Sequence, residues 1–398
     1  MVDAPRITML LDNAFRPDPR VANEARSLVQ AGYRVTILAW DREGDLPPRE
    51  LWRGVRIERI TVRSRHGRGS AQVLYLALFW CKILWRLLGR PVDAIHCHDF
   101  DTLPVGWLAA ALKRCRLVYD AHESYADMLG ANVAPWIKRT VVWLERRLAG
   151  RTDATLTVGS LLEADLRRRG ARHTWVVGNW KRLDEFAFDP AVVAARRSEM
   201  ALDGPTLVTY IGWLNADRGI APLLEAVEAD PDVALLVGGD GPSAPDVRRA
   251  AERCDRVRYL GFVDPAQIPL YTAMADVVYY GLDASNVNAQ YSAPNKLFEA
   301  LAAGKAMVCN NCGEIGRIVR EEDCGIVVPQ LTREAVADAL AELRQPQRLA
   351  ECQARAHEAG RLRYNWAEAE RQLLALYDSI GIPAPKDSGD DPRQGGRT

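Results

Sequence analysis

The feature that most constrains the fold is an alternation of strand-like and helix-like segments, which begins twice along the chain. The apolar run Ile7–Leu11 is followed by a polar loop, a helical segment over 21–31 that stops at Gly32, and a second apolar run over 34–40. Strand, loop, helix and strand in this order open a parallel, doubly wound sheet. The same order restarts at Thr206–Ile211, so the sequence predicts two Rossmann-like α/β domains.

We predict a first domain over 1–183, a second over 184–365, a last helix within 366–382 and a disordered tail over 383–398. Further strands are predicted over 55–62, 94–96, 117–119, 154–158, 174–177, 233–237, 257–260, 277–280, 306–309 and 325–328, and further helices over 72–88, 103–112, 219–229 and 265–275. Residues 184–201 are expected to connect the domains. The two sheets are expected to face each other across a cleft, with ligands at the carboxyl ends of the strands.

The net charge of zero conceals an asymmetry between the two halves of the 398-residue chain. Residues 1–180 carry 28 Lys and Arg against 19 Asp and Glu, whereas the remainder carries 24 against 33. We therefore expect the halves to meet different partners. The eight cysteines lack disulfide-framework spacing and no secretory leader precedes the first strand, which favours a reducing, cytoplasmic location.

Two segments combine aromatic and basic residues, over 73–89 and 136–147. The first, with Lys82 and Arg86 among Trp and Leu, is too short and too charged to span a bilayer. Such segments can lie peripherally on an anionic membrane surface. The alternative is that they pack within the domain with solvated basic faces, and the sequence leaves both open.

A short helix predicted after Pro294 has an N-terminus suited to a phosphate. Pro294 fits a first helical turn and Gly304 a helix stop. The free N–H groups of the helix start, together with Asn295 and Lys296, favour an anion. Glu299 lies one turn further on the same face, within reach of a sugar or ribose hydroxyl. An ordinary surface helix is the alternative.

Glycine turns follow three strands of the second half. Gly212 leads to Arg218, which we expect to point at the same place as Lys296; an Arg and a Lys beside a helix N-terminus suit a diphosphate. The turn over 238–242 permits close approach of a ligand to the backbone.

Polar residues also end two strands of the first half, His96, His98 and Asp99 on one and Asp120, His122 and Glu123 on the next. The pattern resembles the ligands of a two-metal hydrolase. Such a site requires further histidines downstream, and the chain has only six. We therefore predict no metal, and for either His96 or His98 singly we favour a structural residue whose ring is satisfied by the backbone.

In combination, these motifs resemble the retaining glycosyltransferases of family 4, which have the GT-B fold. The motifs similar to the family's donor domain are Ile211-Gly212…Arg218-Gly219, Val237–Pro242, Leu260–Val263 and Pro294–Gly304. Those similar to its acceptor domain are Asp18–Val21, His96–Asp99 and Asp120–Glu123. The final helix is similar to one that crosses back onto the first domain, and the resemblance extends to about residue 382.

The resemblance implies transfer of a sugar from a nucleotide-diphosphate sugar, UDP- or GDP-linked, to a glycan or lipid-linked acceptor hydroxyl in glycan or glycoconjugate biosynthesis. It implies retention of anomeric configuration without a metal or cofactor, by a front-face displacement in which the departing phosphate helps to deprotonate the acceptor. Such an enzyme works in the cytoplasm or on the inner face of the cell membrane, and nucleic acid is not a partner.

By matching position, Arg218 would hold the diphosphate, Glu299 the ribose, and His122 the donor sugar near the reacting carbon. These three are the implied catalytic residues. The remaining implied donor-binding residues are Gly212, Gly239, Asp240, Phe262, Val263, Tyr291, Asn295 and Lys296, with Phe262 and Val263 beside the base. The implied acceptor-binding residues are Asn13, Arg16, Arg20, His98 and Asp99.

Three positions depart from the family pattern. Trp213 stands where an Arg is frequent, a loss that Lys296 can offset. Tyr291 stands where a second Glu near the donor sugar is frequent, eight positions before Glu299. The glycine-rich loop after the first strand is replaced by residues 13–17. The donor sugar and the acceptor stay open, and so do two alternatives: a GT-B nucleotide-sugar epimerase, and a non-catalytic nucleotide-sugar-binding scaffold.

Overall fold

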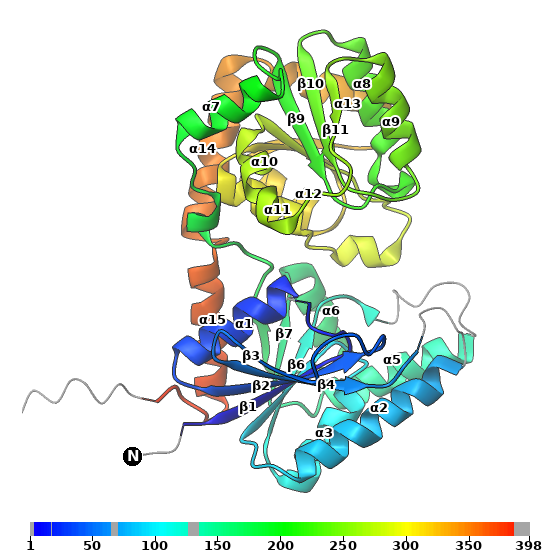
Figure 1. The fold of residues 1–398 in the computed structure, drawn as a ribbon, viewed down its shortest axis with the longest axis vertical. Coiled ribbons are helices and arrows are strands. Elements are labelled where there is room, and N and C mark those ends of the chain that lie inside the picture. The colour runs from blue at the N-terminus through cyan, green and yellow to red at the C-terminus, as the bar shows by residue number, and fades with distance from the viewer. Residues whose placement is uncertain (1–3, 17, 65–70, 126–134, 386–398) are drawn as a thin grey trace, which may run out of the picture. The chain divides into compact units, whose positions relative to one another are not determined.

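The computed structural model describes residues 4–16, 18–64, 71–125 and 135–385, and the tail predicted from 383 lies outside them from 386 onward. It divides the chain into two compact units. The first holds residues 1–158, 163–177 and the chain from Glu370, and the second holds 159–162 and 178–369. Each unit is built around one sheet, as Figure 1 shows.

The sheet of the first unit has the strand order β3-β4-β2-β1-β5-β6-β7-β8. Its strands are β1 (Arg6–Leu11), β2 (Arg34–Asp41), β3 (Arg49–Trp52), β4 (Val55–Thr61), β5 (Ala94–His98), β6 (Arg116–Ala121), β7 (Ala154–Thr157) and β8 (Thr174–Val176). Neighbouring strands are parallel apart from β3, which pairs antiparallel with β4. The edge strand β3 is an addition to the predicted set.

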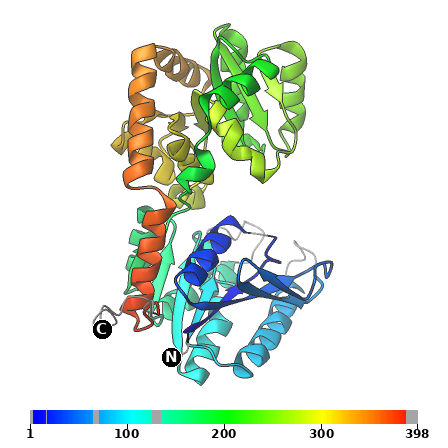
Figure 2. The same ribbon diagram turned by 60° about the vertical axis from the view of Figure 1, so that its left-hand side comes forward.

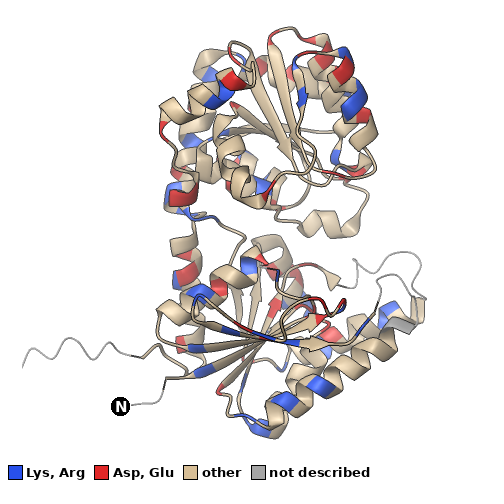
Figure 3. Cartoon of the chain, in the orientation of Figure 1, with Lys and Arg blue, Asp and Glu red and all other residues tan. Residues whose placement is uncertain are grey.

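Helices cover both faces of this sheet. They are α1 (Pro19–Gln30), α2 (Ala71–Leu88), α3 (Leu103–Lys113), α5 (Pro135–Ala149), α6 (Ser160–Arg169) and the last helix α15 (Trp366–Ser379). Alternation along β5 separates the faces, because His96 points to α15 and its Tyr377, whereas Cys97 meets Gly106 of α3. Figure 2 shows α15, in red, lying beside the first sheet, and Figure 3 shows Lys and Arg spaced along α2 and α5.

The sheet of the second unit has the order β11-β10-β9-β12-β13-β14 and is parallel throughout. Its strands are β9 (Thr206–Ile211), β10 (Val233–Gly238), β11 (Val257–Tyr259), β12 (Val277–Tyr280), β13 (Ala306–Asn310) and β14 (Gly325–Val328). Its helices are α7 (Pro190–Glu199), α8 (Ile220–Ala229), α9 (Ala244–Arg253), α10 (Ile268–Met274), α11 (Asn295–Ala303), α12 (Gly313–Glu321), α13 (Arg333–Leu343) and α14 (Pro346–Leu362).

Two apolar layers hold this second sheet. Side chains of α8, α9 and α13 pack on one face of the strands, and those of α10 on the other. Two expectations are corrected. Residues 184–201 are not only a connection, because Asp189 caps the helix α7 there. Pro294 is the N-cap of α11 with extended backbone, so the helix begins at Asn295 rather than at the proline.

Tyr377 of α15 is fully buried in the first unit. Its ring lies 5.6 Å from that of Tyr33, and its hydroxyl lies 2.9 Å from His96 Nδ1. We expect Tyr377→Ala to lower the free energy of unfolding by about 3–5 kcal/mol, because it leaves a large cavity. Urea denaturation followed by tryptophan fluorescence measures this, and the exposed Asp378→Ala on the same helix is the control. Equal stability of the two variants would contradict this packing role.

Candidate functional site

Each sheet has a point where the chain winds away in opposite directions from two neighbouring strands. In the first sheet the neighbours are β1 and β5, and in the second they are β9 and β12. Ligands of open α/β sheets bind beyond the carboxyl ends of the strands at such a point. Most residues predicted for the site follow one of these four strands or the adjacent β6, so the fold gathers them into one group in each unit.

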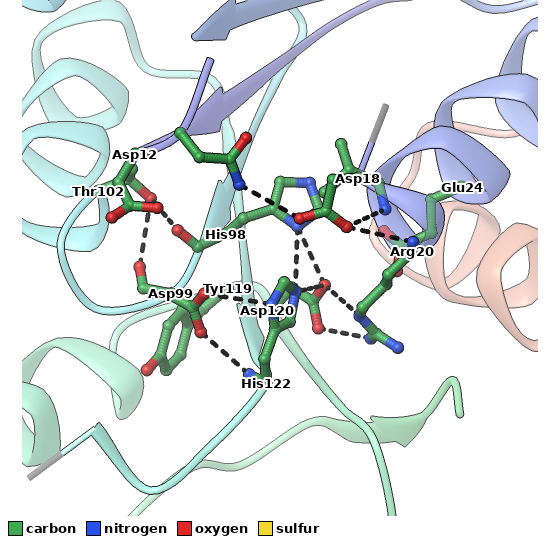
Figure 4. Close-up of polar contacts among 12 residues, drawn as sticks. Asp12, Asp18, Arg20, Glu24, His98, Asp99, Thr102, Tyr119, Asp120 and His122 are labelled. Atoms are coloured by element: carbon green, nitrogen blue, oxygen red, sulfur yellow. Dashed lines mark hydrogen bonds and ion pairs between the residues drawn. The ribbon is translucent and has the colours of Figure 1, made fainter. Parts of the chain in front are cut away.

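A buried ion pair organises the group in the first unit (Figure 4). Arg20, in the first turn of α1, donates from Nε and Nη2 to the two carboxylate oxygens of Asp120 on β6, at 2.9 and 2.6 Å. His98 Nδ1 lies 3.1 Å from the same carboxylate. Asp120 and His98 are fully buried and Arg20 nearly so. The pair therefore fixes α1 against the carboxyl ends of β5 and β6.

His122 is held by two carboxylates. Its Nε2 lies 2.8 Å from Asp120 Oδ2 and its Nδ1 lies 3.1 Å from Asp99 Oδ2, while its backbone N–H donates to Asp99 Oδ1. Asp99 has a backbone φ of 58°, which is disfavoured for a residue other than glycine. Strained backbone of this kind gathers at functional sites, where the surroundings hold it.

The charges within this group stabilise one another. Burial lowers the pKa of His122, but Asp99 and Asp120 outweigh burial and hold that pKa well above its usual value. Burial raises the pKa of Asp120, but the positive charges of Arg20 and His122 outweigh burial and hold that pKa well below its usual value. These two carboxylates favour the imidazolium form of His122, in which both ring nitrogens donate and neither has a lone pair with which to act as a base.

One buried group of the described residues has the composition of a metal site. Ligand atoms of Glu24, His96, His98 and Asp120 lie within 4.8 Å of one another. However, the oxygens of Asp120 already accept hydrogen bonds, and Arg20 Nε lies 3.3 Å from Glu24 Oε1. The guanidinium of Arg20 therefore supplies positive charge at this group, and the absence of a metal stays a prediction.

A cavity of about 660 Å³ opens beside this group, beyond the carboxyl ends of β1 and β2. Asn13 and Arg16, two of the implied acceptor residues, line it together with Trp40 and Arg42. Arg16 is paired with Glu43 and Asp45. The structure thus places Asn13 and Arg16 at a cavity and Arg20 and His98 in the interior.

In the second unit, two lysines converge on the start of α11. Lys296 Nζ donates to Glu299 Oε2 at 2.5 Å, and Lys181 Nζ lies 3.8 Å from Glu299 Oε1. Lys181 also donates to Asn295 Oδ1 at 2.7 Å. Glu299 is buried. Two ammonium groups beside one carboxylate, at a helix N-terminus with partial positive charge, leave this place cationic.

Arg218 follows β9, the strand beside β12. Its guanidinium lies 5.3 Å from the ring centre of Tyr280, the last residue of β12, and Tyr280 in turn feels the charges of both Arg218 and Glu299. Arg218 Nε also lies 3.6 Å from Asp217 Oδ1, and the convergence of Arg218 and Lys296 on one place stays a prediction.

The glycine turns bring backbone segments into contact. A Cβ at Gly239 would lie 1.8 Å from Gly212 O, and Gly239 has a φ of 134°. Only glycine fits there. Asp240 is exposed beside it and accepts a hydrogen bond from Gly241 N–H. Phe262 is 80% exposed, whereas Val263 is buried in the core.

The two departures Trp213 and Tyr291 also lie in the second unit. Trp213 is exposed, and its carbonyl oxygen accepts from Tyr210 Oη at 2.7 Å. Tyr291 is half-buried at the end of the short 3-10 helix Val287–Tyr291.

Sequence reasoning missed Lys181 and Glu24. Glu24 carries a signal, because it is a charged residue within the apolar stripe of α1, between Val21 and Leu28. Lys181 carries none, since its partners Asn295 and Glu299 lie more than a hundred positions away in sequence.

Comparison with known proteins gives consistent results in both halves. A family model described as "Glycosyl transferase 4-like domain" matches residues 17–180, and one described as "Glycosyl transferases group 1" matches residues 205–345.

Two curated relatives illustrate the similarity. The α-D-kanosaminyltransferase of Streptomyces kanamyceticus is 25% identical over 60% of this chain and 64% of that protein, slightly under two thirds of its length. The phosphatidyl-myo-inositol mannosyltransferase of Mycobacterium tuberculosis is 27% identical over 72% of this chain and 74% of that protein.

Solved structures share the fold. Sucrose-phosphate synthase from Thermosynechococcus elongatus superposes with a TM-score of 0.78 at 19% identity, covering 95% of this chain and 99% of the other. Anabaena Alr3699/HepE in complex with UDP-glucose superposes with a TM-score of 0.73 at 16% identity, covering 94% and 99%. The predicted GT-B fold is confirmed.

The buried group predicts a pH dependence of stability. Burial and the nearby Asp120 raise the pKa of Glu24 to about 8, above its ordinary value of 4.5. The folded protein thus binds more protons than the unfolded chain between these values, and stability falls as pH rises through this window, by up to about 1.4 kcal/mol per pH unit. Glu24→Gln should flatten the fall.

Urea denaturation between pH 5 and 8 measures this slope. The matched control is Glu43→Gln, at an exposed residue paired with Arg16, which should keep the wild-type slope. A slope unchanged in Glu24→Gln would show that Glu24 titrates as it does in the unfolded chain.

Proposed function

Since the chain belongs to the glycosyltransferases of family 4, we propose that it transfers a sugar from a nucleotide-diphosphate sugar to an acceptor hydroxyl in glycan or glycoconjugate biosynthesis. The observation that carries the proposal is the cationic N-terminus of α11, where Lys181 and Lys296 flank the buried Glu299. The donor is UDP- or GDP-linked, as the UDP-glucose complex of HepE and a GDP-mannose-dependent relative suggest by analogy.

The charges favour a diphosphate leaving group. Lys296 and Lys181 exceed the charge of Glu299 by one. Arg218 is balanced by Asp217 at 3.6 Å, and the helix dipole adds positive charge. In this proposal the nucleotide diphosphate departs toward these groups, which stabilise its developing negative charge. Glu299, oriented by both lysines, accepts a hydrogen bond from the donor ribose.

In the first unit, we assign substrate contact to accessible side chains and a positioning role to buried ones. His122 contacts the donor sugar near its reacting carbon, with Asp99 beside it, while Asn13 and Arg16 meet the acceptor at the cavity they line. Arg20 and His98 act through Asp120, which they hold in place, because their own side chains are buried.

We further propose that the reaction retains anomeric configuration and proceeds without a metal. An imidazolium at His122 cannot accept a proton, which favours deprotonation of the acceptor by the departing phosphate. Proton NMR of the anomeric signal of the product tests this, and an inverted product contradicts it.

The acceptor is proposed to be lipid-linked, with the enzyme working peripherally on the inner face of a membrane. The helix α2 carries exposed Leu74, Leu78, Trp85 and Leu88 on one side. In the part of the chain that the structure describes, no helix has the length and apolarity to cross a bilayer. The similarity to a phosphatidyl-myo-inositol mannosyltransferase supports a lipid acceptor, and eight unpaired cysteines support a reducing compartment.

For the donor site, we expect the double variant Arg218→Ala and Lys296→Ala to lose at least about 100-fold in affinity for the nucleoside diphosphate, because two charge-assisted contacts are removed. Isothermal titration calorimetry measures this. The control is Arg249→Ala with Arg253→Ala, two exposed arginines of α9. Unchanged affinity in the first variant overturns the diphosphate assignment, and binding without turnover in the wild type favours the scaffold alternative.

For the membrane, we expect Leu78→Glu with Trp85→Glu to reduce sedimentation with anionic vesicles at least about tenfold, since two apolar side chains no longer enter the interface. The control, Val192→Glu with Leu362→Glu, changes exposed apolar residues of the second unit. Equal loss in both variants would make the effect one of net charge.

A further inference from the structure

A large basic cavity lies at the opposite edge of the first sheet from His122. It has a volume of about 1130 Å³ and opens at the amino ends of β1 and β2. Its lining comes from β1, β2, the β3–β4 hairpin and the end of α2 with the turn that follows. None of the residues implied for glycosyl transfer lines it, so this cavity is separate from the site described above.

The lining has an excess of positive charge. Its charged residues are Arg6, Arg34, Arg49, Arg56, Arg86, Arg90 and Glu58. Glu58 is shared by Arg86 and Arg90, at 2.9 and 2.8 Å, and a further carboxylate outside the lining, Asp93, pairs with Arg6. The lining therefore holds six arginines, against Glu58 within it and Asp93 beside it.

Two arginines of the hairpin stand out. Among the described residues, the guanidinium groups of Arg49 and Arg56 form no hydrogen bond or ion pair, and both residues are exposed. Arg49 opens β3 and Arg56 lies on β4, whose backbones pair. Leu51 shares the face of Arg49, because side chains alternate along a strand, and it is 72% exposed.

The cavity has an apolar rim. Trp85 and Leu88 of α2 line it and are 75% and 49% exposed. They are the last members of the exposed stripe that begins at Leu74, so the apolar side of α2 leads directly into the basic cavity. Figure 3 shows basic residues on α2 and on the strands at this edge.

We propose that this cavity binds the phosphate headgroup of an anionic phospholipid, while the apolar rim enters the membrane interface. Unpaired guanidinium groups can form bidentate hydrogen bonds with phosphate oxygens. A soluble anion would leave Trp85, Leu88 and Leu51 in water, whereas a lipid occupies both the basic and the apolar parts. The proposal rests on the membrane contact proposed above and adds a specific headgroup site to it.

The test compares vesicles of phosphatidylcholine that contain either phosphatidic acid or phosphatidylserine, adjusted to equal zeta potential. Diffuse attraction depends only on surface potential, whereas a phosphate site prefers the phosphate monoester. We expect the wild type to bind the phosphatidic acid vesicles at least about tenfold more tightly. Arg49→Ala with Arg56→Ala should remove this preference and weaken binding roughly 30-fold, equivalent to about 1 kcal/mol for each arginine.

The control is Arg248→Ala with Arg333→Ala, two exposed arginines of the second unit, which should keep the preference. Equal weakening in both double variants, or no preference in the wild type, overturns the headgroup site. Binding of soluble glycerol 3-phosphate as tight as that of vesicles would identify a site for soluble anions and overturn the lipid assignment.

Stabilisation by nucleoside diphosphate is measured on the same variants and should be unchanged. A wild type that binds nucleotide but shows no preference between the two vesicles refutes the headgroup site and leaves the proposed transferase standing. Lost vesicle binding in Trp85→Glu but not in Arg49→Ala with Arg56→Ala would keep the membrane contact and refute the headgroup site.

Discussion

The first unit depends on the buried ion pair between Arg20 and Asp120. A carboxylate without a partner is costly in an interior, and removing one partner of a buried pair costs several kcal/mol. Here Asp120 is fully buried, and its carboxylate lies within hydrogen-bond distance of Arg20, His98 and His122. The pair thus joins α1 to the central strands. Because Asp120 also contacts His122, the same ion pair fixes the position and the charge of His122.

The second unit also holds a buried carboxylate beside cationic side chains. Glu299 is buried beside Lys181 and Lys296. The two ammonium groups stabilise the carboxylate and together carry one more positive charge than it neutralises. The helix start at Asn295 adds its free N–H groups. The positive charge left over is what the proposed donor site needs to attract a diphosphate.

The sequence predicted the sheets well because buried parallel strands are short apolar runs; the runs over 206–211, 277–280 and 325–328 coincide with β9, β12 and β14. The sequence did not predict features that depend on pairing at the sheet edge or on contacts between distant parts of the chain. The exposed edge strand β3 has no apolar run, and the partners of Lys181 meet it only through the fold. Glycine turns and polar strand ends predicted which strand ends carry the candidate residues, whereas the burial of His98 followed only from the packing.

The most direct test of the nucleotide-sugar transferase is thermal stabilisation by UDP, GDP, ADP and TDP, each with a chelator and with Mg²⁺. A ligand at a hundred times its dissociation constant adds roughly 2.7 kcal/mol to the folded state. We predict stabilisation by one nucleotide, equal with and without metal, which also identifies the base. No stabilisation by any of the four, or stabilisation that requires Mg²⁺, would contradict a donor site built from Arg218, Lys181 and Lys296 alone.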